Sequence, residues 1–455
     1  MNAERINLKE IIGGRYDNSY VLFHHRLLSY KYPSSPLQKF LISKPQYGAN
    51  EASISRESNE IPRYIRITDI DENGCLADNL GATAKNVESK YILKNNDILI
   101  ARSGNTVGKS YIHKTDTVNE TCFFAGYLIR FVIDSNLILP DYVFIFTKLS
   151  VFANWVKVTQ RVTGQPNINA EEYSNLPIPV PPIEVQRKII EIYQNAQKAR
   201  LNKIEEAKQL LDGIEDYIAN KLQLNTIRKR GEKHQPFTLK STSLFGSRFD
   251  VQFHAGIKDA IRQTEEVPYK ALGEIAAFSS EGWNQKSIFN DKFPYIEISS
   301  INTTVGCIED ISSVSLNNPP SRAKKIVRRD DILISTTRPN RGAICIYDCD
   351  NISIASTGFS VIRETDNCVR KEYLYLALRL SSSLEQMSLR CSGGNYPAIT
   401  ESELKKILIP IPSITIQEDI IETVAKTRNI ASQLQEQGNQ LMETAKQKIE
   451  NIILG

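Results

Sequence analysis

The sequence repeats itself, and the repeat constrains the fold more than any other feature. The heptapeptide YIRITDI at Tyr64–Ile70 returns as YIEISSI at Tyr295–Ile301 (295 − 64 = 231). The tetrapeptide DILI at Asp97–Ile100 returns at Asp331–Ile334 (331 − 97 = 234). An offset that drifts by only a few residues is typical of a duplication with small insertions in loops. The chain is therefore expected to contain two similar globular units, with a duplication that lacks functional symmetry as the alternative.

Each copy closes with a proline-rich segment followed by a long stretch with an apolar seam. Leu176–Pro182 has four prolines in seven positions, which forces an extended backbone and marks a boundary. From Ile183 to about Leu224 apolar side chains recur at alternating steps of three and four, and Ile416 to Ile452 repeats this pattern. Both stretches are predicted to be coiled-coil helices, and a helix of about 40 residues is about 60 Å long. A narrow seam is not stable alone in water, so the two helices are expected to pair. The residues assigned to packing between the helices are Tyr193, Leu211, Ile214, Val424 and Leu434.

The two globules have the texture of a mixed α/β fold. In the first, short β-like runs such as Tyr64–Ile70 crowd together, and apolar residues at helical spacing follow from Asp141 to about Thr159. The second repeats this texture, with its helix from Glu372 to Leu389. The strands are too crowded for regular βαβ alternation, so we predict an α+β fold: two similar mixed α/β domains separated by two long coiled-coil helices. The predicted boundaries are 1–180 for the first domain, 181–236 for the central helix, 237–411 for the second domain and 412–455 for the C-terminal helix.

The bulk composition sets broad limits on the class of protein. With 455 residues the chain exceeds what one hydrophobic core usually holds. No apolar run reaches the roughly 18 residues needed to cross a bilayer, and the polar start is not a signal peptide. The seven cysteines have no metal-ligand spacing and are expected to be reduced, which indicates a cytoplasmic protein. The net charge of +4 is compatible with a polyanionic partner but does not require one.

Two motifs are similar to those of enzymes, but neither is complete. Gly104–Ser110 follows a predicted strand and is similar to a phosphate-binding loop, yet it has three residues between its glycines where that motif needs four. The matching stretch Thr337–Ala343 has no lysine in the corresponding place. Asn318–Ser321 is similar to the motif of adenine-amino methyltransferases, but a serine cannot stack on a flipped base, so a turn is expected there. We predict no catalytic site and no metal site in this chain.

The order of globule, proline-rich break and long helix occurs twice, and short motifs accompany it. These motifs are Arg15-Tyr16-Asp17 and Arg248-Phe249-Asp250, Leu272-Gly273-Glu274-Ile275, the two Asp-Ile-Leu-Ile strands, and Leu-x-Ile-Pro-x-Pro before Ile-x-x-Gln at Leu176 to Gln186, with an Ile-Pro-Ile-Pro variant at Leu408 to Gln417. Each motif is weak alone, but two ordered sets at a constant offset are specific. Together they resemble the specificity subunit of type I restriction–modification systems over nearly the full chain. The first copy departs from the second only slightly, with Leu37-Gln38-Lys39-Phe40 where the second has Leu-Gly-Glu-Ile.

The resemblance implies a DNA sequence-recognition subunit that is itself non-catalytic. In that family each globule is a target-recognition domain that reads one half of a bipartite, asymmetric site in double-stranded DNA. The two long helices of that family pack antiparallel, fix the unread gap and dock two modification (methyltransferase) subunits, and restriction (translocase-nuclease) subunits would be further partners. S-adenosylmethionine, ATP and Mg²⁺ would then belong to partner subunits, with no cofactor in this chain. The alternatives are a coiled-coil scaffold and a nucleotide-hydrolysing enzyme that uses the Gly104–Ser110 loop.

The residues predicted to contact DNA lie in polar loops at corresponding places of the two copies. Arginine can pair with guanine, and asparagine or glutamine with adenine, which favours these residue types. For any one of them, a turn former or a solvated charge is an equally good interpretation. The predicted contacts in the first domain are Arg102, Ser103, Asn105, Thr106, Lys109, Arg161, Thr163, Gln165 and Asn167. Those in the second domain are Trp283, Asn284, Gln285, Lys286, Arg338, Asn340, Arg341, Arg390, Ser392, Asn395 and Tyr396.

Overall fold

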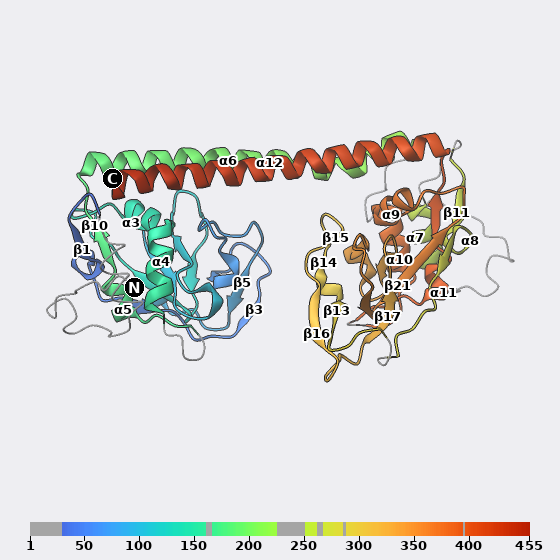
Figure 1. Ribbon diagram of the computed structural model, residues 1–455, viewed down its shortest axis with the longest axis horizontal. Coiled ribbons are helices and arrows are strands. Elements are labelled where there is room, and N and C mark those ends of the chain that lie inside the picture. Colours follow the sequence, from blue (N-terminus) through green and yellow to red (C-terminus); the bar gives the residue numbers. More distant parts are fainter. Residues whose placement is uncertain (1–29, 161–165, 225–250, 262–266, 285–287, 395) are drawn as a thin grey trace. The chain divides into compact units, whose positions relative to one another are not determined.

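The computed structural model describes residues 30–160, 166–224, 251–261, 267–284, 288–394 and 396–455 (Figure 1). The chain divides into two compact units. Unit 1 comprises Met1–Ile204 and Gln435–Gly455, and unit 2 comprises Glu205–Leu434. Each unit therefore combines one globule with part of each long helix. The Arg-Tyr-Asp and Arg-Phe-Asp motifs lie outside the described residues.

The globule of unit 1 is built from short strands, short helices and 3-10 turns. Its strands are β1 (Ser34–Pro36), β2 (Gln46–Tyr47), β3 (Ser53–Ser55), β4 (Arg63–Ile65), β5 (Ala82–Ala84), β6 (Ile98–Ala101), β7 (Ser110–Ile112), β8 (Cys122–Phe124), β9 (Leu128–Phe131) and β10 (Pro177–Pro179). Its helices and turns are η1 (Leu37–Phe40), η2 (Ile67–Asp69), η3 (Ser89–Tyr91), η4 (Gly104–Thr106), α3 (Pro140–Phe146), α4 (Ser150–Thr159) and α5 (Ala170–Ser174).

The described strands of unit 1 form two larger sheets and one small one. The first sheet has the order β2-β9-β6-β7 and is antiparallel throughout. The second has the order β3-β5-β4-β8 and contains the parallel pair β4 and β8. The small sheet pairs β1 with β10, which ties the proline-rich segment before the first long helix to its own globule.

The globule of unit 2 has the same kinds of element. Its strands are β11 (Tyr269–Ala271), β12 (Ala276–Phe278), β13 (Lys292–Ile296), β14 (Ile301–Asn302), β15 (Cys307–Ile308), β16 (Ser312–Ser315), β17 (Ala323–Val327), β18 (Ile332–Ser335), β19 (Ile344–Ile346), β20 (Ser353–Ser356), β21 (Phe359–Thr365) and β22 (Leu408–Pro410). Its helices and turns are α7 (Val251–Ala260), α8 (Leu272–Ile275), η6 (Ile298–Ser300), η7 (Pro339–Arg341), α9 (Lys371–Arg379), α10 (Ser381–Leu389) and α11 (Glu401–Leu404). Asn318–Ser321 lies in the turn region between β16 and β17, as the sequence predicts.

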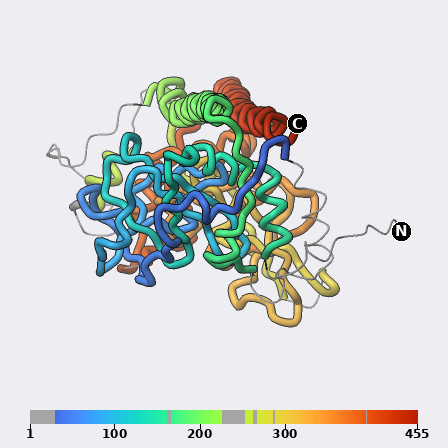
Figure 2. The backbone as a smooth tube through the Cα atoms, turned by 90° about the vertical axis from the view of Figure 1, so that its left-hand side faces the viewer, coloured from blue at the N-terminus to red at the C-terminus, as the bar shows by residue number. Residues whose placement is uncertain are grey.

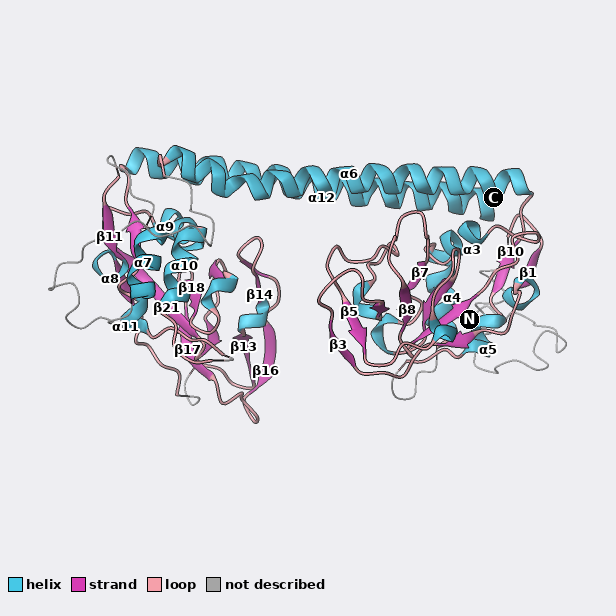
Figure 3. Ribbon diagram, turned by 180° about the vertical axis from the view of Figure 1, so that it is seen from behind, coloured by secondary structure: helices cyan, strands magenta, loops and turns pink. Residues whose placement is uncertain are grey.

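The strands of unit 2 follow the plan of unit 1 with one exchange at a sheet edge. The order β12-β21-β18-β19 corresponds to β2-β9-β6-β7, and β13 and β20 form the parallel pair. The second sheet, β16-β13-β20-β17, has an extra edge strand beside β20, whereas unit 1 has its extra edge strand, β3, beside β5. Helices α9 and α10 lie against the sheet that contains β18 and β21 (Figure 3). The duplication predicted from the sequence is therefore present in the topology.

The two long helices are α6 (Ile183–Lys221) and α12 (Ile414–Leu454), and they lie side by side within each unit (Figure 2). In unit 1, Arg200 of α6 reaches Asn439 of α12, with 3.5 Å between Nε and Oδ1. In unit 2, the ammonium of Lys221 pairs with Asp419 at 2.7 Å. The partner numbers fall along α12 as they rise along α6, so the helices are antiparallel, as predicted. Helix α6 ends at Lys221, three residues before the predicted end at Leu224.

The residues assigned to helix packing in unit 2 lie in two different clusters. Leu211 and Leu434 belong to a small apolar cluster shared by α6 and α12. Ile214 and Val424 belong to the main core of unit 2, which both helices share with the globule. The seam therefore serves two contacts, one with the partner helix and one with the globule beneath.

In unit 1 the helices pack on the globule as well as on each other, and the predicted apolar pattern from Ile416 to Ile452 was wrong at Leu441, which it counts as a seam residue. Tyr193 of α6 is buried in the globule core, where its ring meets Phe144 edge-on at 6.3 Å between centroids. Leu441 of α12 is 41% exposed, whereas Met442 and Ile449 are buried in that same core. The buried stripe near the C-terminus therefore follows the globule and not the heptad seam.

Each long helix predicted inside a globule is broken into two. In unit 1 the break lies between α3 and α4, and in unit 2 it lies at Leu380, whose ψ of 142° is extended. The hydroxyl of Thr147 donates to the carbonyl of Phe144, and the hydroxyl of Ser383 donates to that of Ala377. A hydroxyl that satisfies a carbonyl at a helix end lets the helix stop without a buried unpaired acceptor. The spacing of the apolar residues does not indicate that a hydroxyl ends the helix at these two places.

The repeated heptapeptide is a strand only in its first half. In both units the strand gives way to a 3-10 turn, η2 or η6. The carboxylate of Asp69 accepts a hydrogen bond from the amide of Arg66 at 2.9 Å. In unit 2 the hydroxyl of Ser300 accepts from the amide of Glu297 at 3.2 Å. The side chain at the end of the motif thus closes a turn, which corrects the predicted continuous strands.

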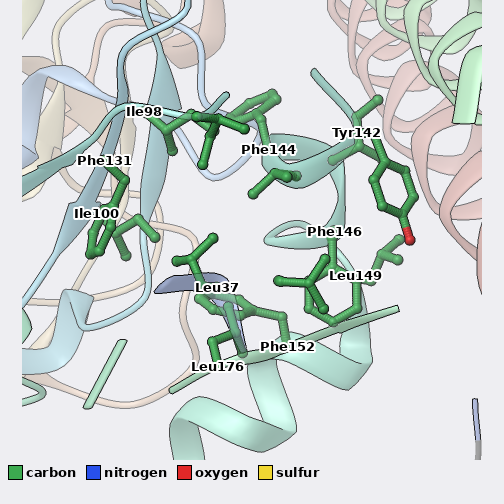
Figure 4. Packing of buried hydrophobic residues seen from close by; sticks show 14 of the residues in the cluster. Leu37, Ile98, Ile100, Phe131, Tyr142, Phe144, Phe146, Leu149, Phe152 and Leu176 are labelled. Atoms are coloured by element: carbon green, nitrogen blue, oxygen red, sulfur yellow. The ribbon is translucent and has the colours of Figure 1, made fainter. Parts of the chain in front are cut away.

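The core of the unit 1 globule lies between its antiparallel sheet and the helices α3 and α4. Figure 4 shows Ile98 and Ile100 of β6 and Phe131 of β9 facing Phe144 and Phe146 of α3. All five side chains are at most 5% exposed. Their burial gives the sheet a fixed position on which loops can be held.

A buried glutamine in the first turn of each long helix fixes that helix to its globule. Its amide group donates to the proline carbonyl five residues earlier, at 2.9 Å in both units. Its oxygen accepts from the amide of Leu139 at 3.0 Å for Gln186, and from the amide of Arg370 at 2.8 Å for Gln417. The Ile-x-x-Gln motif after each proline-rich segment therefore joins three segments of its unit.

Candidate functional site

The two polar loops of unit 1 lie against each other. Ser103 and Asn167 form an isolated β-bridge, and the amide of Gly104 donates to the carbonyl of Pro166 at 2.9 Å. We call residues 102–109 and 166–168 the loop pair of unit 1. Because the β-bridge joins loops that enter from β6 and from α4, their polar side chains share one surface.

Unit 2 joins its two loops with the same backbone bonds. Thr337 and Ala398 form the bridge, and the amide of Arg338 donates to the carbonyl of Pro397 at 2.8 Å. Ser392 and Ala398 also exchange two amide–carbonyl bonds of 2.9 Å, which close the second loop on itself. Residues 336–342, 390–394 and 396–398 form the loop pair of unit 2.

The side chains on the loop pair of unit 1 differ in how they are held. The guanidinium carbon of Arg102 lies 5.0 Å from the ring centre of Tyr47, which belongs to β2. The hydroxyl of Thr106 donates to the carbonyl of Ser103 at 3.3 Å, so it stabilises the turn. Asn105 is exposed. Arg102 and Asn105 are thus the predicted residues best placed to meet a ligand in this loop.

Four backbone amides of the glycine loop in unit 1 are already bonded within the unit. The amides of Gly104, Val107, Gly108 and Lys109 all donate to backbone carbonyls of this unit. The ammonium of Lys109 pairs with Glu72 at 3.2 Å, and its side chain is only 14% exposed. A phosphate site needs amides that point at the ligand. The loop therefore gives no support to the nucleotide-hydrolysing alternative.

The loop pair of unit 2 presents an arginine on an aromatic ring. The guanidinium carbon of Arg338 lies 4.7 Å from the ring centre of Tyr396, and Tyr396 is 72% exposed. Asn340 and Arg341 are exposed on the adjoining turn η7, and Ser392 is exposed in the second loop. Four of the predicted polar residues and one aromatic ring therefore share this surface.

A buried carboxylate–arginine pair lies at the other end of the strand that leads into each loop pair. Asp97 precedes β6 and pairs with Arg130 at 3.4 Å, and burial raises the pKa of this carboxyl. Asp331 precedes β18 and pairs with Arg363 at 2.9 Å. These pairs hold the central strand to its neighbour, which explains the aspartate of the repeated tetrapeptide.

Two of the predicted DNA contacts are enclosed by the fold of unit 2. Arg390 pairs with Glu403 at 3.0 Å and lies 5.6 Å from the ring centre of Phe253. Trp283 is 4% exposed and packs on Phe293 at 4.5 Å between centroids. Both placements favour a packing role, because an enclosed side chain has little surface left for a base.

The remaining predicted contacts cannot be placed on the loop pairs. Asn284 is exposed next to the buried Trp283. The role of these remaining residues in DNA contact stays a prediction. The residues that lie outside the described ranges are Arg161, Thr163, Gln165, Gln285, Lys286 and Asn395.

Two exposed tyrosines at the loop pair of unit 1 were not predicted from the sequence. Tyr47 lies beneath Arg102, and its hydroxyl accepts from the amide of Ala170 at 3.1 Å. Tyr127 is 60% exposed, and its carbonyl accepts from the amide of Arg102 at 3.0 Å. A tyrosine directly after Gly126 was the only local signal, and it does not distinguish an exposed ring from a buried one.

Three further observations concern possible cofactors and surroundings. Among the residues that the structure describes, no three His, Cys, Asp or Glu side chains gather closely enough to hold a metal ion. No helix in these ranges is both long and apolar enough to span a membrane. All seven cysteines are unpaired thiols.

Comparison with protein families gives a match in both halves of the chain. Residues 49–212 and 264–450 match the family model described as "Type I restriction modification DNA specificity domain". The two matched regions together cover more than half of the chain and contain both loop pairs. The duplicated architecture thus coincides with a duplicated domain of one known family.

Two curated proteins are similar to this chain in sequence. Over 169 residues the chain is 28% identical to the specificity subunit of the type I restriction enzyme HindI of Haemophilus influenzae. That match covers 36% of this chain and spans only a third (33%) of the Haemophilus subunit. Over 384 residues, which are 83% of each protein, the chain is 21% identical to the specificity subunit of the type I restriction enzyme MjaVIII of Methanocaldococcus jannaschii.

Solved structures that resemble this chain include two from type I systems. One comes from work on the assembly and conformational transition of the type I R-M system; it has 15% identity, a TM-score of 0.48, and covers 93% of this chain and 97% of its own. The other is the HsdS subunit of Thermoanaerobacter tengcongensis, with 14% identity, a TM-score of 0.34, and 94% and 97% coverage. The family match, which spans both halves, carries the assignment that follows.

Proposed function

The chain belongs to the family of type I restriction modification DNA specificity domains, so its function is DNA sequence recognition, and we propose that it is the specificity subunit of a type I restriction–modification complex. Each unit reads one half of a bipartite, asymmetric target in double-stranded DNA.

The loop pairs are the observation that carries the proposal. Both units join their loops with the same backbone bonds, and each presents an arginine on a tyrosine ring. The side chains around these arginines differ between the units. A shared scaffold with different donors and acceptors suits two different half-sites, because each base pair shows its own pattern in the major groove.

The long helices supply the second part of the proposal. Helices α6 and α12 have 39 and 41 residues. At 1.5 Å per residue each is about 60 Å long, which exceeds one turn of duplex DNA. The paired helices would fix the length of the unread gap, and their exposed faces would dock two modification subunits.

The chain itself catalyses no step in this proposal. It directs methyltransferase subunits, and restriction subunits where these are present, to the site that it reads. S-adenosylmethionine, ATP and Mg²⁺ act in those partners, in the cytoplasm. The amides of Gly104, Val107, Gly108 and Lys109 already donate to backbone carbonyls, which supports this division of roles.

The test uses the full chain in complex with its modification subunits. Methylated positions in the DNA of cells that make the complex should define one bipartite target with a fixed gap. Binding of the purified complex should weaken steeply with salt, with a slope set by the number of phosphates neutralised. A complex that shows no preference among duplexes would contradict the proposal.

A further inference from the structure

The backbone at Arg338 is strained in a way that its counterpart in unit 1 is not. Arg338 has φ 49° and ψ 52°, which is the left-handed region. Gly104 makes the equivalent amide bond to a proline carbonyl and has φ 77°. Glycine adopts this region freely, whereas a residue with a side chain is disfavoured there. Such strain persists mainly at functional positions, so the arginine needs an explanation beyond the turn itself.

The side chain of Arg338 is ordered before any ligand arrives. Its guanidinium stacks on Tyr396 at 4.7 Å, and the tyrosine is 72% exposed. The hydrogen bond from the amide of Arg338 to the carbonyl of Pro397 and the two hydrogen bonds between Ser392 and Ala398 fix the loops that carry Arg338 and Tyr396. A planar guanidinium that is already stacked loses less conformational freedom when it binds.

We infer that Arg338 is a specificity-determining residue that recognises one guanine in the half-site of unit 2. The inference rests on the proposed function. A guanidinium fork can donate two hydrogen bonds to O6 and N7 of guanine, a pair of acceptors that no other base presents in the major groove. Tyr396 acts through Arg338 and is a positioning residue.

The test compares Arg338→Gly with the unchanged chain, each in complex with its modification subunits. Both complexes select duplexes from a library in which every target position carries all four base pairs. Arg338→Gly is expected to lose roughly 10- to 100-fold of the preference for G·C at a single position and to keep every other preference. Its melting temperature should equal or exceed that of the unchanged chain, because glycine relieves the strain. A preference unchanged at every position, or an equal loss of affinity for all sequences, overturns the inference.

Matched variants separate recognition from charge and from stacking. Arg338→Lys keeps the charge without the fork and should lose the same single preference. Tyr396→Phe keeps the ring and should keep the preference, whereas Tyr396→Ala should weaken it at that position. Arg329→Ala removes an exposed arginine of unit 2 that pairs with Asp350, and it should leave the selected sequence unchanged.

The possible failures can be told apart. If the unchanged complex selects no sequence, the proposed function fails. If it selects a target and Arg338→Gly selects the same one, only the inference about Arg338 fails. If Arg329→Ala loses the same preference as Arg338→Gly, the effect belongs to net charge, and the inference is overturned.

Discussion

The loop pair of unit 1 and the loop pair of unit 2 have the same backbone bonds but present arginine from different positions. In unit 1 the arginine stands two residues before the left-handed position, which is Gly104. In unit 2 the arginine occupies that position itself, as Arg338. The stacking tyrosine also differs, since Tyr47 comes from a strand and Tyr396 from the second loop. Duplication has thus kept the backbone bonds between the loops and moved the arginine, a difference that suits the asymmetric target proposed above.

The turn glycines Gly74 and Gly306 offer the largest test of how alike the two scaffolds are. Both have φ 80°, and an added Cβ would collide with a helix side chain. In unit 2 the obstacles are Tyr375 and Arg379, which are fixed by bonds to loop carbonyls. In unit 1 they are the ring of Phe144 and the ammonium of Lys148, and an added Cβ would lie farther from both than it would from the obstacles in unit 2. Gly306→Ala should cost about 3 kcal/mol from left-handed strain and overpacking together, and Gly74→Ala should cost less.

Native-state hydrogen exchange of each globule measures these costs separately. An equal effect of Gly74→Ala and Gly306→Ala would contradict the difference in crowding around the two glycines. A negligible effect of both would contradict the fold of the two turns.

The buried glutamines of the long helices give the next largest effect. Gln417 donates to Cys368 as well as to its proline carbonyl and accepts from Arg370, whereas Gln186 lacks the extra bond. Gln417→Ala should lower the stability of unit 2 by about 2 to 3 kcal/mol, because buried backbone groups lose their partner. Gln186→Ala should lower that of unit 1 by somewhat less. Faster exchange of the Arg370 amide in Gln417→Ala is the local check.

Variants of Arg390 and Asn105 test the difference between a loop residue that the fold encloses and one that is exposed to solvent. Arg390→Ala breaks a partly buried ion pair and should cost about 1 to 3 kcal/mol of stability without changing the sequence that the complex selects. Asn105→Ala should change stability by less than about 0.5 kcal/mol and act on DNA binding instead. Thermal melting and duplex selection on both variants check this. A changed target with Arg390→Ala would show that the arginine reaches a base after all.

The smallest expected effect is a difference in pH dependence between the units. Burial raises the pKa of Asp97. As pH falls, the Asp97 carboxylate is therefore protonated in the folded state before it is protonated in the unfolded state, and unit 1 gains stability as pH falls through the folded pKa. In unit 2 the hydrogen bond from Arg328 lowers the pKa of Glu281, so its contribution is present above the unfolded value of 4.5 and is lost as pH falls through the folded pKa. Exchange measured between about pH 6 and 3 should show opposite trends, which Asp97→Asn and Glu281→Gln remove one at a time.

The period of the apolar residues was enough to predict the long helices and their pairing, whereas their antiparallel direction was an implication of the family resemblance. The period failed at Leu441, because the heptad seam says nothing about the globule beneath the helix. The apolar period also predicted a single helix in place of α3 and α4, and another in place of α9 and α10. It did so because the hydroxyl hydrogen bond at each break leaves the apolar spacing unchanged.

The candidate site was predictable in position but not in detail. The polar loops were found because they recur at a constant offset in both copies. The enclosure of Arg390 and Trp283 could not be found, because it depends on Phe253 and Phe293, which contact them from other segments of the chain.

The sequence by itself determined the duplication, the proline-rich boundaries and the two long helices, because each is encoded by local pattern and spacing. Only the tertiary structure decided which loops contact each other. It also decided which arginine stacks on an exposed tyrosine and which arginine is enclosed. Those outcomes depend on β-bridges and on packing between segments that are far apart in the chain. Their free energies are sums over many contacts, so no single stretch of residues determines them.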